Sequence, residues 1–181
     1  MTDEPTEQRI SLRMLTLKTL VVHTVTYFVA GILAYTLGGY EQTFSEPPLS
    51  YFMRPTSDPL VMAGPLFQPI RGVVFALAFY PLRNVLFAAR RGWLILWWLL
   101  LALGVLSTFG PAPGSLEGLV YTVIPPLDQI FGLWEVLLQT FLFSALLVYW
   151  VNQPGKRWLS WTLGIAFLIV IILPLLGLLV G

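Results

Sequence analysis

The chain has 181 residues, of which 57% are hydrophobic and only 10% are charged, and its mean hydropathy is +0.80. Soluble domains carry a charge on about a quarter of their residues, so this composition excludes a soluble domain and indicates a polytopic membrane protein. The chain contains no cysteine, which excludes a disulfide, a thiolate metal site and a thiol nucleophile.

The apolar residues fall into five runs, so we expect a single all-α membrane domain built as a bundle of five transmembrane helices. A helix of about 20 apolar residues crosses a bilayer. The predicted spans are residues 15–37, 66–89, 93–109, 129–151 and 158–180. One short helix, predicted over residues 115–124, is too short to cross and would be interfacial or re-entrant on the outer side.

The first span is longer than the apolar core of roughly 7–15 residues in a secretory signal, and we expect it to be retained. Small and polar residues recur along it at three- and four-residue spacing and therefore share one helix face. These residues are Thr19, His23, Thr26, Tyr27, Ala30, Gly31 and Ala34. Small and hydroxyl-bearing residues let helices approach closely in lipid, so this face is predicted to pack against neighbouring helices.

The connection after the first span, residues 38–59, is rich in proline and serine, and we expect no regular structure there. In the second hydrophobic segment the regular helix is predicted to begin near Pro69, because proline is tolerated in a first turn. The helix is predicted to continue to about Ala89, with a kink at Pro81. Further along, Ser115 is predicted to cap the short helix and Asp128 to cap the fourth span.

Basic residues predict the orientation of the chain. Eight of them fall on one side of the five-span arrangement: Arg9, Arg13, Lys18, Arg83, Arg90, Arg91, Lys156 and Arg157. The other side has only Arg54 and Arg71. Because short loops rich in Lys and Arg stay in the cytoplasm, we expect a multi-pass protein of the plasma or inner membrane, with its N-terminus cytoplasmic and its C-terminus outside.

An arginine and a glutamate are predicted at similar depth in the outer half of the bilayer. Glu135 and Gln139 are four residues apart in the fourth span and share a helix face, while Arg71 lies near the outer end of the second span. A charged side chain at that depth needs a partner. Arg71 and Glu135 could form a proton-linked or anion-coordinating pair, or a salt bridge that only clamps two helices; Glu117 is the alternative partner of Arg71.

Two further carboxylates, Glu117 and Asp128, could face the same region and would suit acid–base work or recognition of a polar head group. The ligand-binding candidates are therefore Gln68, Arg71, Glu117, Asp128, Glu135 and Gln139. His23 is the only histidine and is interpreted as a hydrogen-bonded packing residue of the inner leaflet. No metal or cofactor is expected, because paired ligand spacings are missing, and no motif indicates nucleic-acid binding.

Three functions remain open from the sequence. The first is a non-catalytic, small transport-type or accessory membrane subunit with an outward-facing polar cluster that binds a small polar ligand or stabilises assembly. The second is a membrane-embedded enzyme that acts on a lipid or isoprenoid head group at the outer face. The third is a purely structural subunit of a larger membrane complex. In each case the bilayer is a partner, and other membrane subunits are candidate partners.

Overall fold

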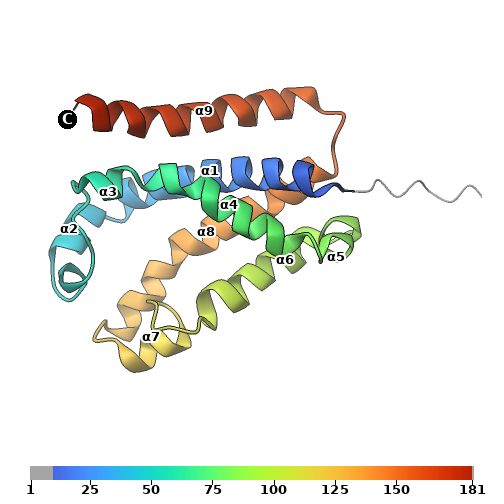
Figure 1. Ribbon diagram of the computed structural model, residues 1–181. Coiled ribbons are helices and arrows are strands. Elements are labelled where there is room, and N and C mark those ends of the chain that lie inside the picture. Colours follow the sequence, from blue (N-terminus) through green and yellow to red (C-terminus); the bar gives the residue numbers. More distant parts are fainter. Residues whose placement is uncertain (1–9, 181) are drawn as a thin grey trace, which may run out of the picture.

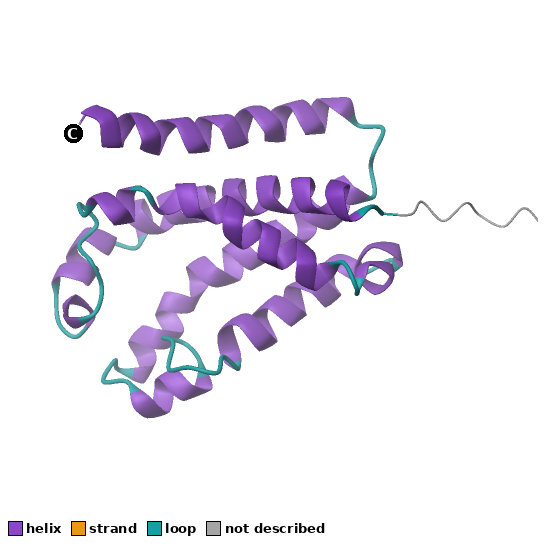
Figure 2. Cartoon of the chain, viewed as in Figure 1, coloured by secondary structure: helices purple, strands orange, loops and turns teal. Residues whose placement is uncertain are grey.

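The computed structural model describes residues 10–180, and every regular element in that range is helical (Figures 1 and 2). The predicted all-helical fold is confirmed. In chain order the elements are α1 (Leu12–Leu37), α2 (Tyr40–Ser45), the 3-10 turn η1 (Leu49–Tyr51), α3 (Pro59–Met62), α4 (Gly64–Phe79), α5 (Arg83–Ala88), α6 (Gly92–Leu101), the π-helical η2 (Ala102–Leu106), α7 (Leu116–Tyr121), α8 (Pro126–Val151) and α9 (Arg157–Val180).

Three of the described helices are long and apolar enough to cross a membrane: α1, α8 and α9. The first two have 26 residues each, and the apolar stretch of α9 has 23. At 1.5 Å per residue they measure about 35–39 Å, which exceeds the roughly 30 Å of a hydrocarbon core. Two further apolar helices are shorter. The first is α4, with 16 residues. The second consists of α6, with 10 residues, and η2, which continues it for 5 more.

Helix α1 is the central element of the bundle. It packs against α4, α8 and α9, and α6 packs against α8 on the far side. Figure 1 shows α9 running alongside α1, while α4 crosses α1 and the α6 and α8 helices incline away from it. The two ends of the bundle therefore differ: α2, α3, α7 and the C-terminus lie at one end, and α5 and the α8–α9 connection lie at the other (Figure 1).

The hydrophobic core lies mainly near the end where α1 begins and α8 finishes. Its buried members are Leu15, Val22, Phe79, Leu86, Phe87, Leu96, Phe143, Leu147, Val148, Trp150, Val151, Leu159 and Leu163. The predicted packing face of α1 is largely confirmed, because its buried residues include Thr19, His23, Thr26, Ala30 and Ala34. On the facing helix, Gly72 is so close to α1 that a Cβ atom there would stand 2.4 Å from the Cα of Leu20.

The second predicted span is wrong in its extent. The helix begins earlier than expected, at Gly64, and ends at Phe79 instead of continuing through a kink to Ala89. Proline lacks the N–H that would continue the helix and clashes with the preceding turn, so Pro81 starts a turn and α5 forms separately after it. The hydrophobic sequence continues through this turn, which is why the apolar pattern alone predicted one long helix.

The remaining boundaries differ by smaller amounts. Helices α1, α8 and α9 begin three, three and one residues before their predicted starts. The third predicted span ends at Leu106 in a π-helical turn, and the short helix occupies only Leu116–Tyr121. As predicted, the Ser115 hydroxyl caps it and accepts from the N–H of Gly118 at 2.9 Å.

The proline-rich connection is more ordered than expected, because α2 and η1 form within it. At its end Asp58 caps α3, where its carboxylate accepts from the N–H of Leu60 at 2.8 Å and pairs with Arg54 at 2.9 Å. The predicted basic residue Arg9 lies outside the described residues.

Candidate functional site

A contact between α2 and α8 involves the predicted site residue Glu135. The hydroxyl of Tyr40 donates a hydrogen bond to Oε2 of Glu135, and both side chains are half-buried. The Phe44 ring stacks on Tyr40 with 4.8 Å between centroids. Burial, together with the hydrogen bond to Glu135, raises the pKa of Tyr40 above its usual value, so the phenol stays protonated and acts as the donor.

A second polar contact, here called the central contact, joins α1 to α4. Nε2 of His23 lies 3.1 Å from Oε1 of Gln68, whose amide nitrogen donates to the carbonyl of Gly64 at 3.2 Å. Because an amide oxygen only accepts, the imidazole is the donor and carries a proton on Nε2. Both side chains are buried, with 2% of His23 and 8% of Gln68 exposed.

Aromatic rings enclose the imidazole of His23. Phe75 of α4 and Phe143 of α8 meet it edge-on, with centroids 4.9 and 5.2 Å away. The other ring nitrogen, Nδ1, has no hydrogen-bond partner among residues 10–180. His23 therefore is the hydrogen-bonded packing residue that the sequence predicted, and it lies near the middle of α1, about 16 Å from the start of the helix.

The predicted pair of Arg71 with Glu135 does not form. Within the described part of the chain the one ion pair closer than 4.0 Å is Arg54–Asp58, so Arg71 is not paired with Glu117 either. Arg71 is exposed on α4, and its guanidinium carbon lies 5.5 Å from the centroid of Phe75.

The other predicted candidates do not converge on one cavity. Gln139 is half-buried one turn below Glu135 on α8, whereas Glu117 and Asp128 are exposed in the first turns of α7 and α8. Asp128 does not cap α8, because that helix already begins at Pro126. Carboxylates in a first turn are favourable beside the N-terminal end of a helix dipole.

Gln129, a residue predicted only as the start of the fourth span, organises the short helix α7. The Gln129 side chain is buried and accepts from the N–H of Gly114 at 3.1 Å. Its amide nitrogen donates to Ile124 O at 2.8 Å, Thr122 Oγ1 at 3.2 Å and Gly118 O at 3.3 Å. The available sequence signal for this role was the position of Gln129 as a lone amide residue between a Gly-rich turn and an apolar run.

The chemistry of these contacts is hydrogen bonding between helices. Among the described residues no three His, Cys, Asp or Glu side chains gather as metal ligands would. Comparison of the chain with protein families, with curated proteins and with solved structures found no match.

Proposed function

We propose that this chain is a non-catalytic, multi-pass protein of the plasma or inner membrane that acts as a small transport-type or accessory subunit. One observation carries the proposal: Glu135 and Gln68, two predicted ligand-binding residues, bond to Tyr40 and His23 inside the bundle. Interhelical hydrogen bonds of this kind hold helices together in lipid. The polar groups therefore fix the arrangement of α1, α2, α4 and α8.

The exposed side of α4 supports assembly with another membrane protein. It carries large apolar side chains, namely Phe67, Ile70, Val73, Val74 and Leu77. Arg71 lies exposed among them. A cation on a lipid-facing flank costs a few kcal/mol on insertion scales, and a carboxylate or free carbonyl from a neighbouring subunit would offset that cost.

The topology that we propose has five crossings, with the N-terminus cytoplasmic and the C-terminus outside. It is supported by the alternating direction of α1, α4, α6, α8 and α9 between the two ends of the bundle (Figure 1). It is also supported by the basic residues. Lys18 lies near the start of α1, Arg83 begins α5 and Arg157 begins α9, and these three starts lie at one end of the bundle (Figure 1).

Site-specific photo-crosslinking in native membranes tests the subunit role. A photoreactive amino acid at Ile70 or Val74 is expected to give a protein adduct of one discrete mass, because a neighbouring subunit would cover this side of α4. The matched positions are Ile165 and Ile169, which are exposed on α9. The Arg71→Gln variant should lose most of the α4 adduct.

Lipid adducts alone from both α4 positions would contradict the subunit role. If the Tyr40→Phe and Glu135→Gln variants both fold normally but lose the cellular phenotype, the contact between Tyr40 and Glu135 is a ligand site and not a helix clamp. The head-group enzyme is not supported by a specific observation, because Glu117 and Asp128 are both exposed.

A further inference from the structure

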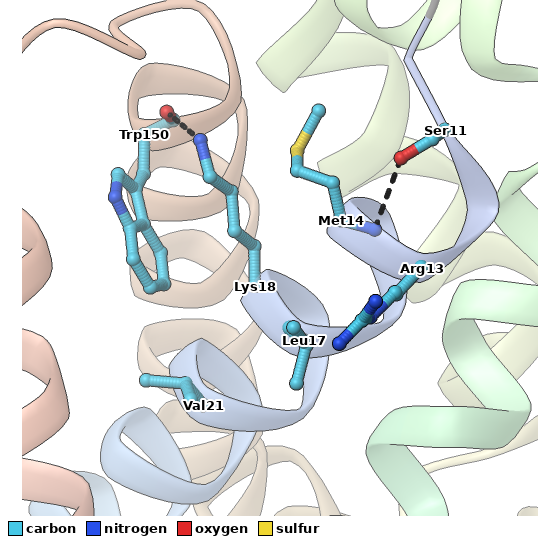
Figure 3. Close-up of a pocket in the computed structure, with 7 residues that line it drawn as sticks. All are labelled: Ser11, Arg13, Met14, Leu17, Lys18, Val21 and Trp150. Atoms are coloured by element: carbon cyan, nitrogen blue, oxygen red, sulfur yellow. Dashed lines mark hydrogen bonds between the residues drawn. The ribbon is translucent and has the colours of Figure 1, made fainter.

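A groove with a basic rim lies along the first turns of α1, beside the end of α8 (Figure 3). We call it the basic groove. Its volume is about 480 Å³, and its lining residues are Ser11, Arg13, Met14, Leu17, Lys18, Val21 and Trp150. Arg13 and Lys18, the two charged residues of the lining, are both cations, and the surface between them is formed by Met14 and Leu17 (Figure 3).

Lys18 is held in place and keeps binding capacity. Its ammonium donates to the carbonyl oxygen of Trp150 at 2.7 Å and lies 5.2 Å from the centre of the Trp150 ring (Figure 3). An ammonium group has three N–H donors, so two remain for an anion after this bond. The side chain is thereby directed across the groove instead of into bulk water.

A second, apolar groove continues along the same two helices. Its volume is about 530 Å³, and its lining residues are Val25, Thr26, Val29, Leu142, Ala145, Leu146 and Tyr149. The hydroxyl of Thr26 is bonded to backbone carbonyls of its own helix. Val25 follows Val21 of the basic groove by one helical turn, and Tyr149 precedes Trp150, so the two grooves follow one another along the seam between α1 and α8.

The combined shape has the dimensions and polarity of a phospholipid. From Lys18 to Val29 the helix rises about 16 Å, close to half of the roughly 30 Å hydrocarbon core, which is the depth of one leaflet. One end is cationic and the rest is apolar. Lys156, from the α8–α9 connection, donates to the hydroxyl of Tyr149, which lines the apolar groove, so a third cation lies beside Tyr149.

We propose that the seam between α1 and α8 binds one anionic phospholipid of the cytoplasmic leaflet. Arg13 and Lys18 contact its phosphate, and the apolar groove holds an acyl chain along Val25, Val29 and Leu146. Charge complementarity selects an anionic lipid over a zwitterionic one, because each basic residue near an anionic head group contributes about fivefold in affinity, equivalent to about 1 kcal/mol.

The test uses the full chain in nanodiscs that contain a photoactivatable phosphatidylglycerol with a diazirine in the acyl chain, or phosphatidylcholine with the same chain. Phosphatidylglycerol should label residues 21–29 and 142–149 about fivefold or more over phosphatidylcholine. The Arg13→Gln/Lys18→Gln variant should bring this ratio to about one. The matched control is Arg90→Gln/Arg91→Gln, which removes the same charge from two exposed residues at the same end and should leave the ratio unchanged.

Two further variants keep the test decisive. Val25→Trp fills the apolar groove without changing charge and should reduce labelling by phosphatidylglycerol. Arg13→Gln alone changes an exposed side chain and should still lower the ratio if Lys18→Gln reduces the folded yield. Equal labelling by the two lipids, or labelling mainly outside the two segments, overturns the proposal. The proposal also fails if labelling appears only after residues 1–9 are deleted, since the occupant would then be the chain's own acidic segment.

Discussion

The Tyr40 hydroxyl and the Glu135 carboxylate form a hydrogen bond that joins α2 to α8 across 95 positions of sequence. Tyr40 lies just beyond the end of α1, so this bond ties the start of the first connection to α8. A carboxylate in a half-buried position loses part of its hydration, and a phenol donor compensates for that loss. The two residues should therefore depend on each other.

A double-mutant cycle measures this dependence. Tyr40→Phe should lower the free energy of unfolding by about 1–2 kcal/mol, because it leaves a partly buried carboxylate without its donor. Glu135→Gln should have a smaller effect, and the double variant should be about 0.5–1 kcal/mol less damaged than the sum of the singles. Graded SDS unfolding in mixed micelles gives these values. Tyr35→Phe, at an exposed tyrosine of α1, is the control and should change nothing; additive losses would refute the contact.

The same contact should weaken in alkali. Burial and the hydrogen bond to Glu135 raise the pKa of Tyr40 in the folded chain above its usual value of 10.0. A raised folded pKa contributes stability that is present below the unfolded pKa and lost as pH rises through the folded one. The stability difference between the wild type and Tyr40→Phe should thus be constant up to about pH 10 and shrink above it. A difference that grows above pH 10 would show that the phenol is not the donor.

Gln129 should keep the short helix α7 docked. Its four hydrogen bonds all end on residues 114–124, so Gln129→Leu removes them together. In this cysteine-free chain, Ile124→Cys, at a side chain 5% exposed, should react with an impermeant thiol reagent about tenfold more slowly than Val123→Cys, which is 80% exposed. Gln129→Leu should abolish the difference. Equal rates in the parent chain would mean that this segment is not docked.

Close approach of α1 and α4 makes Gly72 sensitive to substitution. A Cβ atom at Gly72 would collide with the backbone of Leu20, whereas one at Gly164 of α9 meets nothing within 4 Å. Gly72→Ala should therefore cost about 1–3 kcal/mol, as overpacking does, while Gly164→Ala should be neutral or slightly stabilising. The two melting curves provide the comparison, and indistinguishable curves would place α4 further from α1.

Several of these relationships could be predicted from the sequence, and others could not. The length of an apolar run predicts α1, α8 and α9 well, because a helix must continue for as long as lipid surrounds it. Hydropathy does not detect the turn at Pro81, since Leu82 and Leu86 continue the apolar pattern beyond it. The pairing of Arg71 with Glu135 was predicted from depth alone.

Depth does not specify the direction in which a side chain points. The residue that bonds to Glu135 is Tyr40, which belongs to a connection that was expected to be irregular. The central contact could not be predicted for a similar reason. The spacing of His23 on α1 indicated a packed face, but only the register of α4 against α1 brings it to Gln68.

The five-crossing topology depends most on α6 and η2, whose 10 and 5 residues rise only about 22 Å. A helix shorter than the hydrocarbon core crosses when the bilayer thins locally or flanking residues extend to the interface, and Trp93 near the start of α6 is suited to such anchoring. Reporters fused after Arg91 and Arg157 should read as cytoplasmic, and those after Ser50 and Ser115 as external. The fusion after Ser50 is the matched control, because it follows α1, which is long enough to cross. If Ser50 reads as external but both Arg91 and Ser115 as cytoplasmic, α6 and η2 do not cross, and the bundle has fewer than five spans.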